Sequence, residues 1–190
     1  MQNLIEAIKH YVSLNDNDIQ LIKKLFEIKE LRKNESFLQP GLICDNFAYI
    51  KKGLLRHSIY DDGEEKTIYF SSENDFVCDY ESFISREVSK KVITAMEDTT
   101  IACISYDNMQ IFYNDVHSGE RFGRLYLEET FIKVVNHIIS SHTDSAEQRY
   151  QNFHTSYRHI EQRIPQYYIA SFVGVTPQSL SRIRRNMVKK

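Results

Sequence analysis

Residues 166–185 read QYYIASFVGVTPQSLSRIRR, a stretch that predicts a helix, a tight turn and a second helix. Ala170 is small where two crossing helices must come close, and Gly174 can adopt the left-handed conformation that a tight turn needs. Thr176 followed by Pro177 is typical of a helix N-cap and its first-turn proline. The second helix is therefore expected to begin at Pro177 and to cross the first helix after a short turn.

The predicted second helix has an apolar face and a polar face. Helical spacing directs one set of residues towards Ile169 and Val173 of the first helix: Thr176, Leu180, Ile183 and Met187. The opposite face carries Gln178, Ser181, Arg182 and Arg185. Such a face fits the major groove of DNA, where Arg binds guanine and Gln binds adenine through paired hydrogen bonds, each pair discriminating by about 1–3 kcal/mol. Phosphate contacts are expected from Ser179, Ser181, Arg184 and the terminal lysines.

The basic charge of the chain is concentrated at its carboxyl end. The formal net charge is −2, but residues 149–190 hold eight Lys and Arg against one acidic residue, whereas residues 1–148 hold 16 against 25. The basic residues that stand out are Arg158, Arg163, Arg182, Arg184, Arg185, Lys189 and Lys190. Their field suits a polyanion, and the apolar pattern of the same segment argues against the alternative of a solvated tail. Together with the helix pair, this charge predicts binding to double-stranded DNA.

Composition limits the other possibilities. The chain has 190 residues, of which 42% are hydrophobic and 26% charged, and no apolar run approaches the roughly 18 residues of a membrane span. The first residues do not resemble a signal peptide, so a cytoplasmic protein without membrane contact is expected. Cys44, Cys78 and Cys103 lie 34 and 25 residues apart, a spacing that predicts reduced thiols rather than a disulfide framework or metal motif. Cys78 is either a redox-reactive thiol or a small buried residue.

Two amphipathic helices are expected in the first 25 residues, and Asp16 or Asp18 is expected to cap the second. Short runs of β-branched and aromatic residues follow these helices. The runs lie at residues 26–31, 47–50, 54–60, 66–70, 92–95 and 100–104. Turn signals at Pro40-Gly41, Lys52-Gly53 and Asp61-Asp62-Gly63 separate them at spacings of roughly ten residues. This pattern predicts an antiparallel sandwich or barrel.

A long helix is predicted from Ser118 to about His142, after a short helix from Ser105 to Asn114. Its apolar surface forms two stripes, which are Leu127, Phe131, Val134 and Ile138, and Leu125, Ile132 and Ile139. One stripe can pack on the β domain and the other on a second copy of the chain, which gives a two-fold dimer. Burial of both stripes within one chain is the alternative. The dimer residues expected on this helix are Phe122, Leu125, Ile132 and Ile139.

Five features of the sequence belong together. They are Tyr49-Ile-Lys-Lys-Gly-Leu-Leu-Arg, Asp61-Asp-Gly-Glu-Glu, Ala95-Met-Glu-Asp-Thr, the long helix and Ile169-Ala-Ser-Phe-Val-Gly-Val-Thr-Pro-Gln-Ser-Leu-Ser-Arg-Ile. In this order they resemble the Crp/Fnr family of bacterial transcription regulators. The resemblance implies an α+β fold with a cyclic-nucleotide-binding-like β-roll (a double-stranded β-helix) and N-terminal helices at residues 1–114. A dimerisation helix at 115–144 and a helix-turn-helix module at 145–190 would follow.

The resemblance also implies a function. A homodimer would bind a palindromic DNA site, Gln178 and Arg182 would read bases, and RNA polymerase would be a further partner. The full set of residues expected at the DNA is Thr176, Gln178, Ser179, Ser181, Arg182, Arg184 and Arg185.

The cyclic-nucleotide pocket of that family has a Phe-x-Gly-Glu turn and, ten residues after the Glu, an Arg-Ser/Thr-Ala triplet. Here Cys78 replaces the glycine, Asp79 replaces the glutamate and residues 89–91 replace the triplet. The shorter acid and the missing Arg are expected to prevent physiological binding of cyclic AMP, and strand alternation lets only one of Lys90 and Lys91 point inward. An unknown small-molecule effector is expected near Cys78, Asp79, Tyr80, Glu81, Ser89, Lys90 and Lys91.

Other features of the family are missing from the sequence. Three unclustered cysteines do not suit its four-cysteine iron–sulfur cluster, and haem ligation by His57, His137 or His142 is less expected than an ordinary polar role. Ile164-Pro165 leads directly into the first helix of the pair, which leaves no room for wing hairpins. We expect no metal, cofactor or catalytic residue. The alternatives are a cupin-like binding protein or enzyme with a helical appendage, and a DNA-binding protein whose β domain is a scaffold without an effector.

Overall fold

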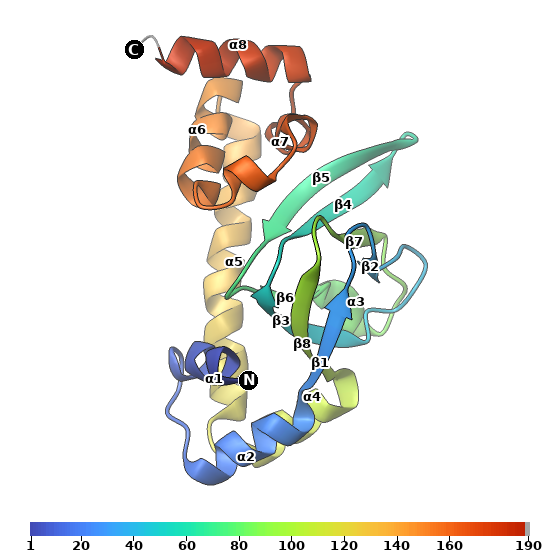
Figure 1. Cartoon of the computed structure of the whole chain (residues 1–190), viewed down its shortest axis with the longest axis vertical. Helices are drawn as coiled ribbons and strands as arrows, with labels where there is room; N and C mark the ends of the chain where they lie inside the picture. Colours follow the sequence, from blue (N-terminus) through green and yellow to red (C-terminus); the bar gives the residue numbers. More distant parts are fainter. Residues whose placement is uncertain (189–190) are drawn as a thin grey trace.

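The computed structural model of the chain describes residues 1–188. Two four-stranded antiparallel sheets form a β-roll, and helices lie beside it and at both ends of the molecule (Figure 1). The helices before the roll are α1 (Gln2–Lys9) and α2 (Asp16–Leu25). Those after it are α4 (Tyr106–Asp115), α5 (Gly119–Thr143), α6 (Ala146–Tyr157), the short 3-10 helix η1 (Glu161–Arg163), α7 (Gln166–Val173) and α8 (Pro177–Val188). Lys189 and Lys190, predicted to meet phosphates, lie outside the described residues.

The two sheets confirm the predicted antiparallel β domain. One has the strand order β1-β8-β3-β6 and the other β2-β7-β4-β5. The strands are β1 (Glu27–Leu31), β2 (Ser36–Leu38), β3 (Asn46–Lys52), β4 (Leu55–Asp61), β5 (Glu64–Ser71), β6 (Phe76–Val77), β7 (Lys91–Ala95) and β8 (Thr99–Ser105). The β4–β5 hairpin closes through Asp62 and Gly63, which both have positive φ as a two-residue hairpin turn requires. No strand follows β8 in residues 1–188.

Some local elements differ from the sequence-based expectations. The cap of α2 is Asn15, whose side chain accepts a hydrogen bond from the Asp18 N–H at 2.9 Å while the Asp18 carboxylate accepts one from the Asn15 N–H at 3.0 Å. The prediction of Asp16 or Asp18 as the cap is therefore wrong, because Asp18 is the partner in a capping box. Strands β2 and β6 and helix α3 (Tyr80–Ser85) were not predicted, since they are too short to show a hydrophobic period.

The main hydrophobic core fills the β-roll and fixes the start of α5. Leu4, Ile5 and Ile8 of α1 are buried against it, and so is Phe122 of α5. Helices α4 and α5 cross so closely that a Cβ on Gly119 would lie 2.2 Å from the Phe112 carbonyl oxygen. The first turns of α5 are therefore part of the sensor-like domain.

Beyond these first turns, α5 runs along the molecule with one side uncovered (Figure 1). Its outer face, which we define as Leu127, Phe131, Ile132, Val134, Ile138 and Ile139, is 37–69% exposed. Burial of both stripes within one chain is thus excluded. Phe122 is only 2% exposed, so its assignment as a dimer residue is wrong, and Leu125 packs against the main core. Both face the β-roll, because the first turns of the helix bury a different side from the later ones.

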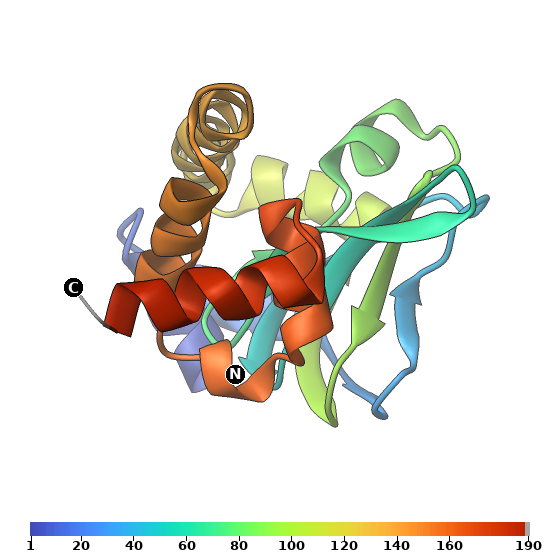
Figure 2. The same ribbon diagram turned by 90° about the horizontal axis from the view of Figure 1, so that it is seen from above.

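A second hydrophobic core joins α6, η1, α7 and α8 into one small helical module. Phe153, Ile160, Ile169 and Leu180 belong to this core. Leu54 and Phe70 of the β-roll belong to it as well, so the module packs directly on the sheet that contains β4 and β5. Viewed from above, α8 lies across the end of the molecule, over α6 and α7 (Figure 2).

Candidate DNA-reading surface and effector cavity

Helices α7 and α8 form the predicted helix-turn-helix. Gly174 ends α7 in the left-handed conformation with φ of 73°. Thr176 caps α8, because its Oγ1 accepts a hydrogen bond from the Ser179 N–H at 3.2 Å. Ala170 and Leu180 are buried between the two helices. The turn chemistry that the sequence predicted is therefore present in the structure.

The side of α8 that faces solvent carries most of the predicted DNA contacts. Gln178, Ser181, Arg182 and Arg185 are exposed, and so is Thr176 at the cap. Ser179 is half-buried, and the Thr176 hydroxyl donates to its Oγ at 3.1 Å. Arg184 is also half-buried, with its guanidinium 3.8 Å from the Glu161 carboxylate. Arg184 is thus partly engaged inside the module, whereas Gln178 and Arg182 project freely one helical turn apart.

Glu161 organises the module beneath this surface, a role that the sequence analysis missed. Its Oε1 accepts a hydrogen bond from the Tyr150 hydroxyl at 2.8 Å, and its Oε2 lies 2.5 Å from His154 Nδ1. Burial and this hydrogen bond raise the pKa of Tyr150 to about 12. The available signal was that Glu161 is the single acidic residue among residues 149–190. A single carboxylate in a basic segment can accept hydrogen bonds and ion pairs from several parts of that segment and so hold them together.

Arg149 joins the end of α5 to the helix-turn-helix. Its Nε donates to the Val173 carbonyl oxygen at 2.8 Å and its Nη1 donates to the Asp144 carbonyl oxygen at 2.7 Å. One side chain thus satisfies backbone acceptors at the carboxyl ends of both α7 and α5. The orientation of the helix-turn-helix relative to α5 depends on this link.

Polar contacts also hold the module on the β-roll. Arg163 makes two hydrogen bonds of 2.9 Å to Glu73 and pairs with Glu97 as well. The Arg56 guanidinium lies 3.9 Å from the centre of the Tyr168 ring. Arg163 was counted among the basic residues that suit a polyanion, and that interpretation is wrong because its charge is neutralised by two carboxylates within the chain.

A cavity of about 740 Å³ lies between α1, the β-roll and α5. Aromatic side chains from distant parts of the sequence dominate its wall: Tyr11, Tyr49, Tyr69, Phe76, Tyr80 and Tyr126. Of the predicted effector residues, Cys78, Tyr80 and Lys91 line it. Glu81 and Lys90 are exposed and lie outside its lining, so their assignment to the pocket is wrong. Lys91 points inward and Lys90 outward, as strand alternation predicted.

Asp79 lies behind this wall and is fully engaged within the chain. It is 2% exposed, accepts a hydrogen bond from the Ser89 Oγ at 2.7 Å and forms an ion pair with Lys91. The residues that stand in the positions of the family's sugar and phosphate ligands therefore bind one another. Three side chains that were predicted to meet an effector, Asp79, Ser89 and Lys91, thus form a closed cluster.

His57 adds a polar group to the same cavity. The ring is buried, and its Nε2 lies 2.9 Å from Ser71 Oγ. Burial and the nearby charge of Lys91 lower the pKa of His57 to about 4, so the ring is neutral at pH 7. The wall therefore offers tyrosine rings and hydroxyls and a neutral imidazole, a lining that suits an aromatic ligand with polar edges.

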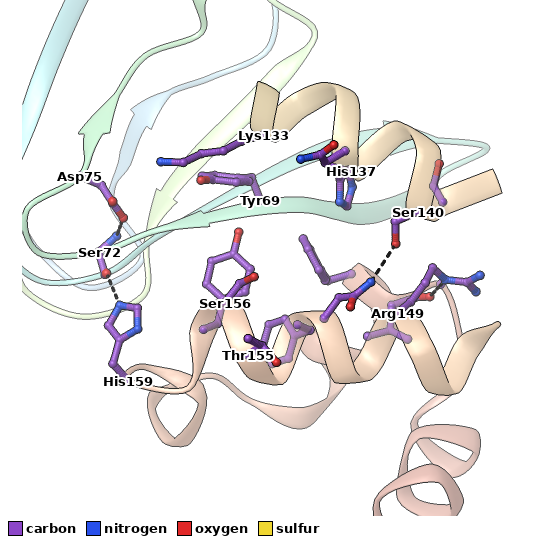
Figure 3. A pocket seen from close by; sticks show the side chains of 18 residues that line it. Tyr69, Ser72, Asp75, Lys133, His137, Ser140, Arg149, Thr155, Ser156 and His159 are labelled. Atoms are coloured by element: carbon purple, nitrogen blue, oxygen red, sulfur yellow. Dashed lines mark hydrogen bonds between the residues drawn. The ribbon is translucent and has the colours of Figure 1, made fainter. Parts of the chain in front are cut away.

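A second cavity, of about 680 Å³, lies where the β-roll, α5 and the helical module meet. Lys133, His137 and Ser140 of α5 line one side of it, with Tyr69 of β5 (Figure 3). Arg149, Thr155 and Ser156 of α6 lie opposite. Tyr69, Lys133 and His137 line the first cavity as well. The two cavities are therefore neighbours, and the second lies between α5 and the helical module, which still touch where Asn152 donates a hydrogen bond to Ser140 Oγ at 3.3 Å.

In residues 1–188 no three His, Cys, Asp or Glu side chains gather in a way that could hold a metal ion. Every helix within that range is too short or too polar to cross a bilayer.

Comparison with known proteins gives a consistent result. Residues 28–115 match the family model of the cyclic nucleotide-binding domain. No curated protein sequence matches the chain. Many solved structures match the chain. The sequence identities of those described below are so low that these matches show a shared fold alone.

Three of these solved structures cover most of the chain. A protein from Eubacterium rectale described as a Crp/Fnr family transcriptional regulator has 20% identity, a TM-score of 0.71 and coverage of 93% of this chain and 85% of its own. FixK2 from Bradyrhizobium japonicum has 14% identity, a TM-score of 0.73 and coverage of 86% and 85%. The c-di-GMP-responsive regulator CLP from Xanthomonas campestris has 14% identity, a TM-score of 0.71 and coverage of 92% of both chains. Residues 28–115 are therefore similar to the cyclic nucleotide-binding domain, and the chain has the fold of solved Crp/Fnr regulators, which its sequence resembles.

Proposed function

We propose that this chain is a cytoplasmic, dimeric and sequence-specific DNA-binding transcription regulator whose β-roll binds a small-molecule effector. The observation that carries the proposal is the exposed face of α8, on which Gln178, Arg182 and Arg185 project from a basic helix-turn-helix. Two solved structures that share the fold are described as a global regulator linked to gene expression and as a transcriptional regulator, which supports the same function. In this proposal residues 1–114 are the sensor domain, 115–144 the connecting helix and 145–190 the DNA-binding module.

The exposed residues of α8 have distinct roles in the proposal. Gln178 and Arg182 contact base edges, because both have long side chains with paired hydrogen-bonding groups and lie on one face of the helix. Thr176, Ser179, Ser181 and Arg185 contact phosphates on either side. Arg184 contributes through its contact with Glu161, which positions α8 on the module. RNA polymerase is a further partner of the regulator on its DNA site.

The outer face of α5 supports the dimer. Six large apolar side chains exposed along one helix exceed what a monomeric helix in water usually shows. Pairing of this face with the same face of a second chain buries it, and the two-fold axis that results matches a palindromic DNA site.

The cavity beneath α1 is the effector site in this proposal, and cyclic AMP is not its ligand. Asp79 is already engaged by Ser89 and Lys91, so neither the acid nor the lysine is free for a ribose or a phosphate. Calorimetry with cyclic AMP should give no heat of binding at concentrations that saturate a cyclic-AMP-binding protein. Tight binding of cyclic AMP in this titration would overturn the assignment.

Selection of bound sequences from a random DNA pool tests the main proposal. We expect a palindrome with half-sites about 34 Å apart, one turn of the double helix. Arg182→Ala should weaken binding to the selected site by about 10- to 100-fold and relax the preference at one base pair of each half-site. Arg121→Ala, which removes an exposed arginine at the start of α5, is the matched control and should bind like the wild type.

Two results would contradict the proposal. One is a wild-type protein that selects no sequence from the pool. The other is an Arg182→Ala variant with the affinity and base preference of the wild type. A salt titration adds a check on the number of phosphate contacts: the slope should correspond to fewer than about ten phosphates per dimer.

A further inference from the structure

Two of the three cysteines lie side by side although they are far apart in the sequence. Cys44 is just before β3 and Cys78 follows β6, and their sulfur atoms are 3.8 Å apart. A disulfide requires about 2 Å between the sulfurs, so a small movement of the side chains is enough to bring them to bonding distance. The third cysteine, Cys103, is buried in β8 and has no such contact among the described residues.

The backbone around the pair is held in place by hydrogen bonds. The Cys44 N–H donates to Ser82 Oγ at 2.9 Å, and Ser82 Oγ donates to the Glu87 carbonyl oxygen at 2.6 Å. Arg86 donates to the Cys44 carbonyl oxygen at 3.3 Å and forms an ion pair with Asp45. These contacts tie the loop that carries Cys44 to α3, which directly follows Cys78. The backbone that places the two sulfurs side by side is therefore held by the fold.

The pair has both access to small molecules and a route to a thiolate. Cys78 lines the 740 Å³ cavity, whereas Cys44 is buried behind it. The hydrogen bond from Cys78 lowers the pKa of Cys44, while burial raises the pKa of Cys78 and raises that of Cys103 to about 11. A pair that has lost one proton therefore carries its negative charge mainly on Cys44, with Cys78 as the S–H donor. Transfer of the remaining proton from Cys78 to Cys44 gives the minor form, in which the charge lies on Cys78, the sulfur that lines the cavity.

We propose that Cys44 and Cys78 form a reversible disulfide when a hydroperoxide enters the cavity. The Cys78 thiolate attacks one peroxide oxygen, the O–O bond breaks, and Cys78 becomes a sulfenic acid while the other oxygen leaves as water after it takes up a proton. The Cys44 sulfur then attacks the Cys78 sulfur and releases the second water, which carries away the Cys44 proton. Two thiols lose two electrons in total, and one hydrogen peroxide is reduced to two water molecules.

The new bond changes the cavity wall. It draws Cys78 away from the cavity and towards the loop before β3, next to Tyr80, which lines the same wall. Oxidation of this pair and occupation of the cavity are therefore coupled. The inference needs no DNA binding, so it can be tested independently of the regulator function.

The test uses the full chain and hydrogen peroxide as the probe. The reduced protein is treated at a peroxide concentration that fully oxidises an exposed reference thiol, and the remaining thiols are then alkylated in denaturant. We expect three alkylated cysteines before oxidation and one afterwards, with the loss of two hydrogen atoms from the intact mass. Peptide mapping should show Cys44 linked to Cys78 and Cys103 alkylated. Dithiothreitol should restore all three thiols.

Serine variants distinguish formation of the Cys44–Cys78 disulfide from other oxidation of the protein. Cys103→Ser is the matched control and should still lose two thiols at the wild-type rate. Cys44→Ser and Cys78→Ser should form no intramolecular disulfide. Retention of three thiols by the wild type, or a disulfide that contains Cys103, would overturn the proposal. If a variant fails to fold, the peptide map of the wild type still shows whether Cys44 and Cys78 form the disulfide.

Discussion

His57 shows how burial of one side chain makes the stability of the β-roll depend on pH. It is 7% exposed, and burial together with Lys91 lowers its pKa from the ordinary 6.5 to about 4. Between these two values the unfolded chain binds a proton that the folded chain does not. The stabilisation associated with neutral His57 is therefore complete above pH 6.5 and is lost as the pH falls to about 4.

His57→Gln removes this titration and keeps a polar side chain that can bond to Ser71. Between pH 6.5 and pH 4 the free energy of unfolding should fall by about 3 kcal/mol more for the wild type than for this variant, since one pKa unit corresponds to about 1.4 kcal/mol. Urea unfolding across the pH range measures both curves. His142→Gln, at an exposed position on α5, should follow the wild type. Parallel curves for His57→Gln and the wild type would contradict a buried, neutral His57.

At the scale of secondary structure, the sequence was informative wherever a hydrophobic period was long enough to count. Helix α5 was predicted within one residue of its observed ends, and Gly174 and Thr176 located the turn and the cap of the helix-turn-helix. Strand β6 has two residues and α3 has six, so neither shows a period. Only the local signals of caps and turns could have indicated them.

The cavity could not be predicted for a different reason. Tyr11, Tyr49 and Tyr126 come from the turn after α1, from β3 and from α5, and only the packing of these segments brings their rings together. Cys78, Tyr80 and Lys91 were predicted correctly only because the resemblance to the Crp/Fnr family pointed to that stretch of the sequence. The same limit applies to the Cys44–Cys78 pair, whose spacing in the sequence resembles neither a disulfide framework nor a metal motif.

The exposed side of α5 leads to a prediction about assembly. Phe131 is the most exposed residue of the outer face, at 69%, and lies midway along it. Phe131→Glu should raise the dissociation constant of the dimer at least tenfold, because a charge would have to lose its water in an apolar interface. Sedimentation equilibrium measures this constant.

A control for this variant is an equally drastic change elsewhere. Ile84→Glu places the same charge at an exposed apolar position of α3, far from the outer face of α5, and should leave the dimer intact. If Phe131→Glu dimerises like the wild type, the exposed face of α5 is not the interface. If both variants become monomeric, the effect comes from charge rather than position, and the proposed interface fails as well.

At the scale of the whole molecule, the sensor and the DNA-binding module are joined by both apolar and ionic contacts. Phe70 of β5 is fully buried, and its ring centre lies 6.1 Å from that of Phe153 and 5.9 Å from that of Phe172. Burial of Glu73 is outweighed by hydrogen bonds from Arg163 and from the Gly53 N–H, so the pKa of Glu73 falls to about 2. This ion pair thus persists in mild acid and weakens only as the pH approaches 2.

This joint should make the two parts unfold together, and Phe70→Ala tests it. Phe83→Ala is the matched control, because Phe83 is equally buried but packs in the main core against Tyr80 and Tyr106. Each change should lower the free energy of unfolding by about 3–5 kcal/mol. Only Phe70→Ala should also release the module, seen as faster amide hydrogen exchange in α6–α8 than in the β-roll. Equal protection of α6–α8 in both variants would mean that the polar contacts of Arg163 with Glu73 and Glu97 and of Arg56 with Tyr168 are enough to hold the module in place. In that case a signal from the effector cavity to the module would not depend on the packing of Phe70.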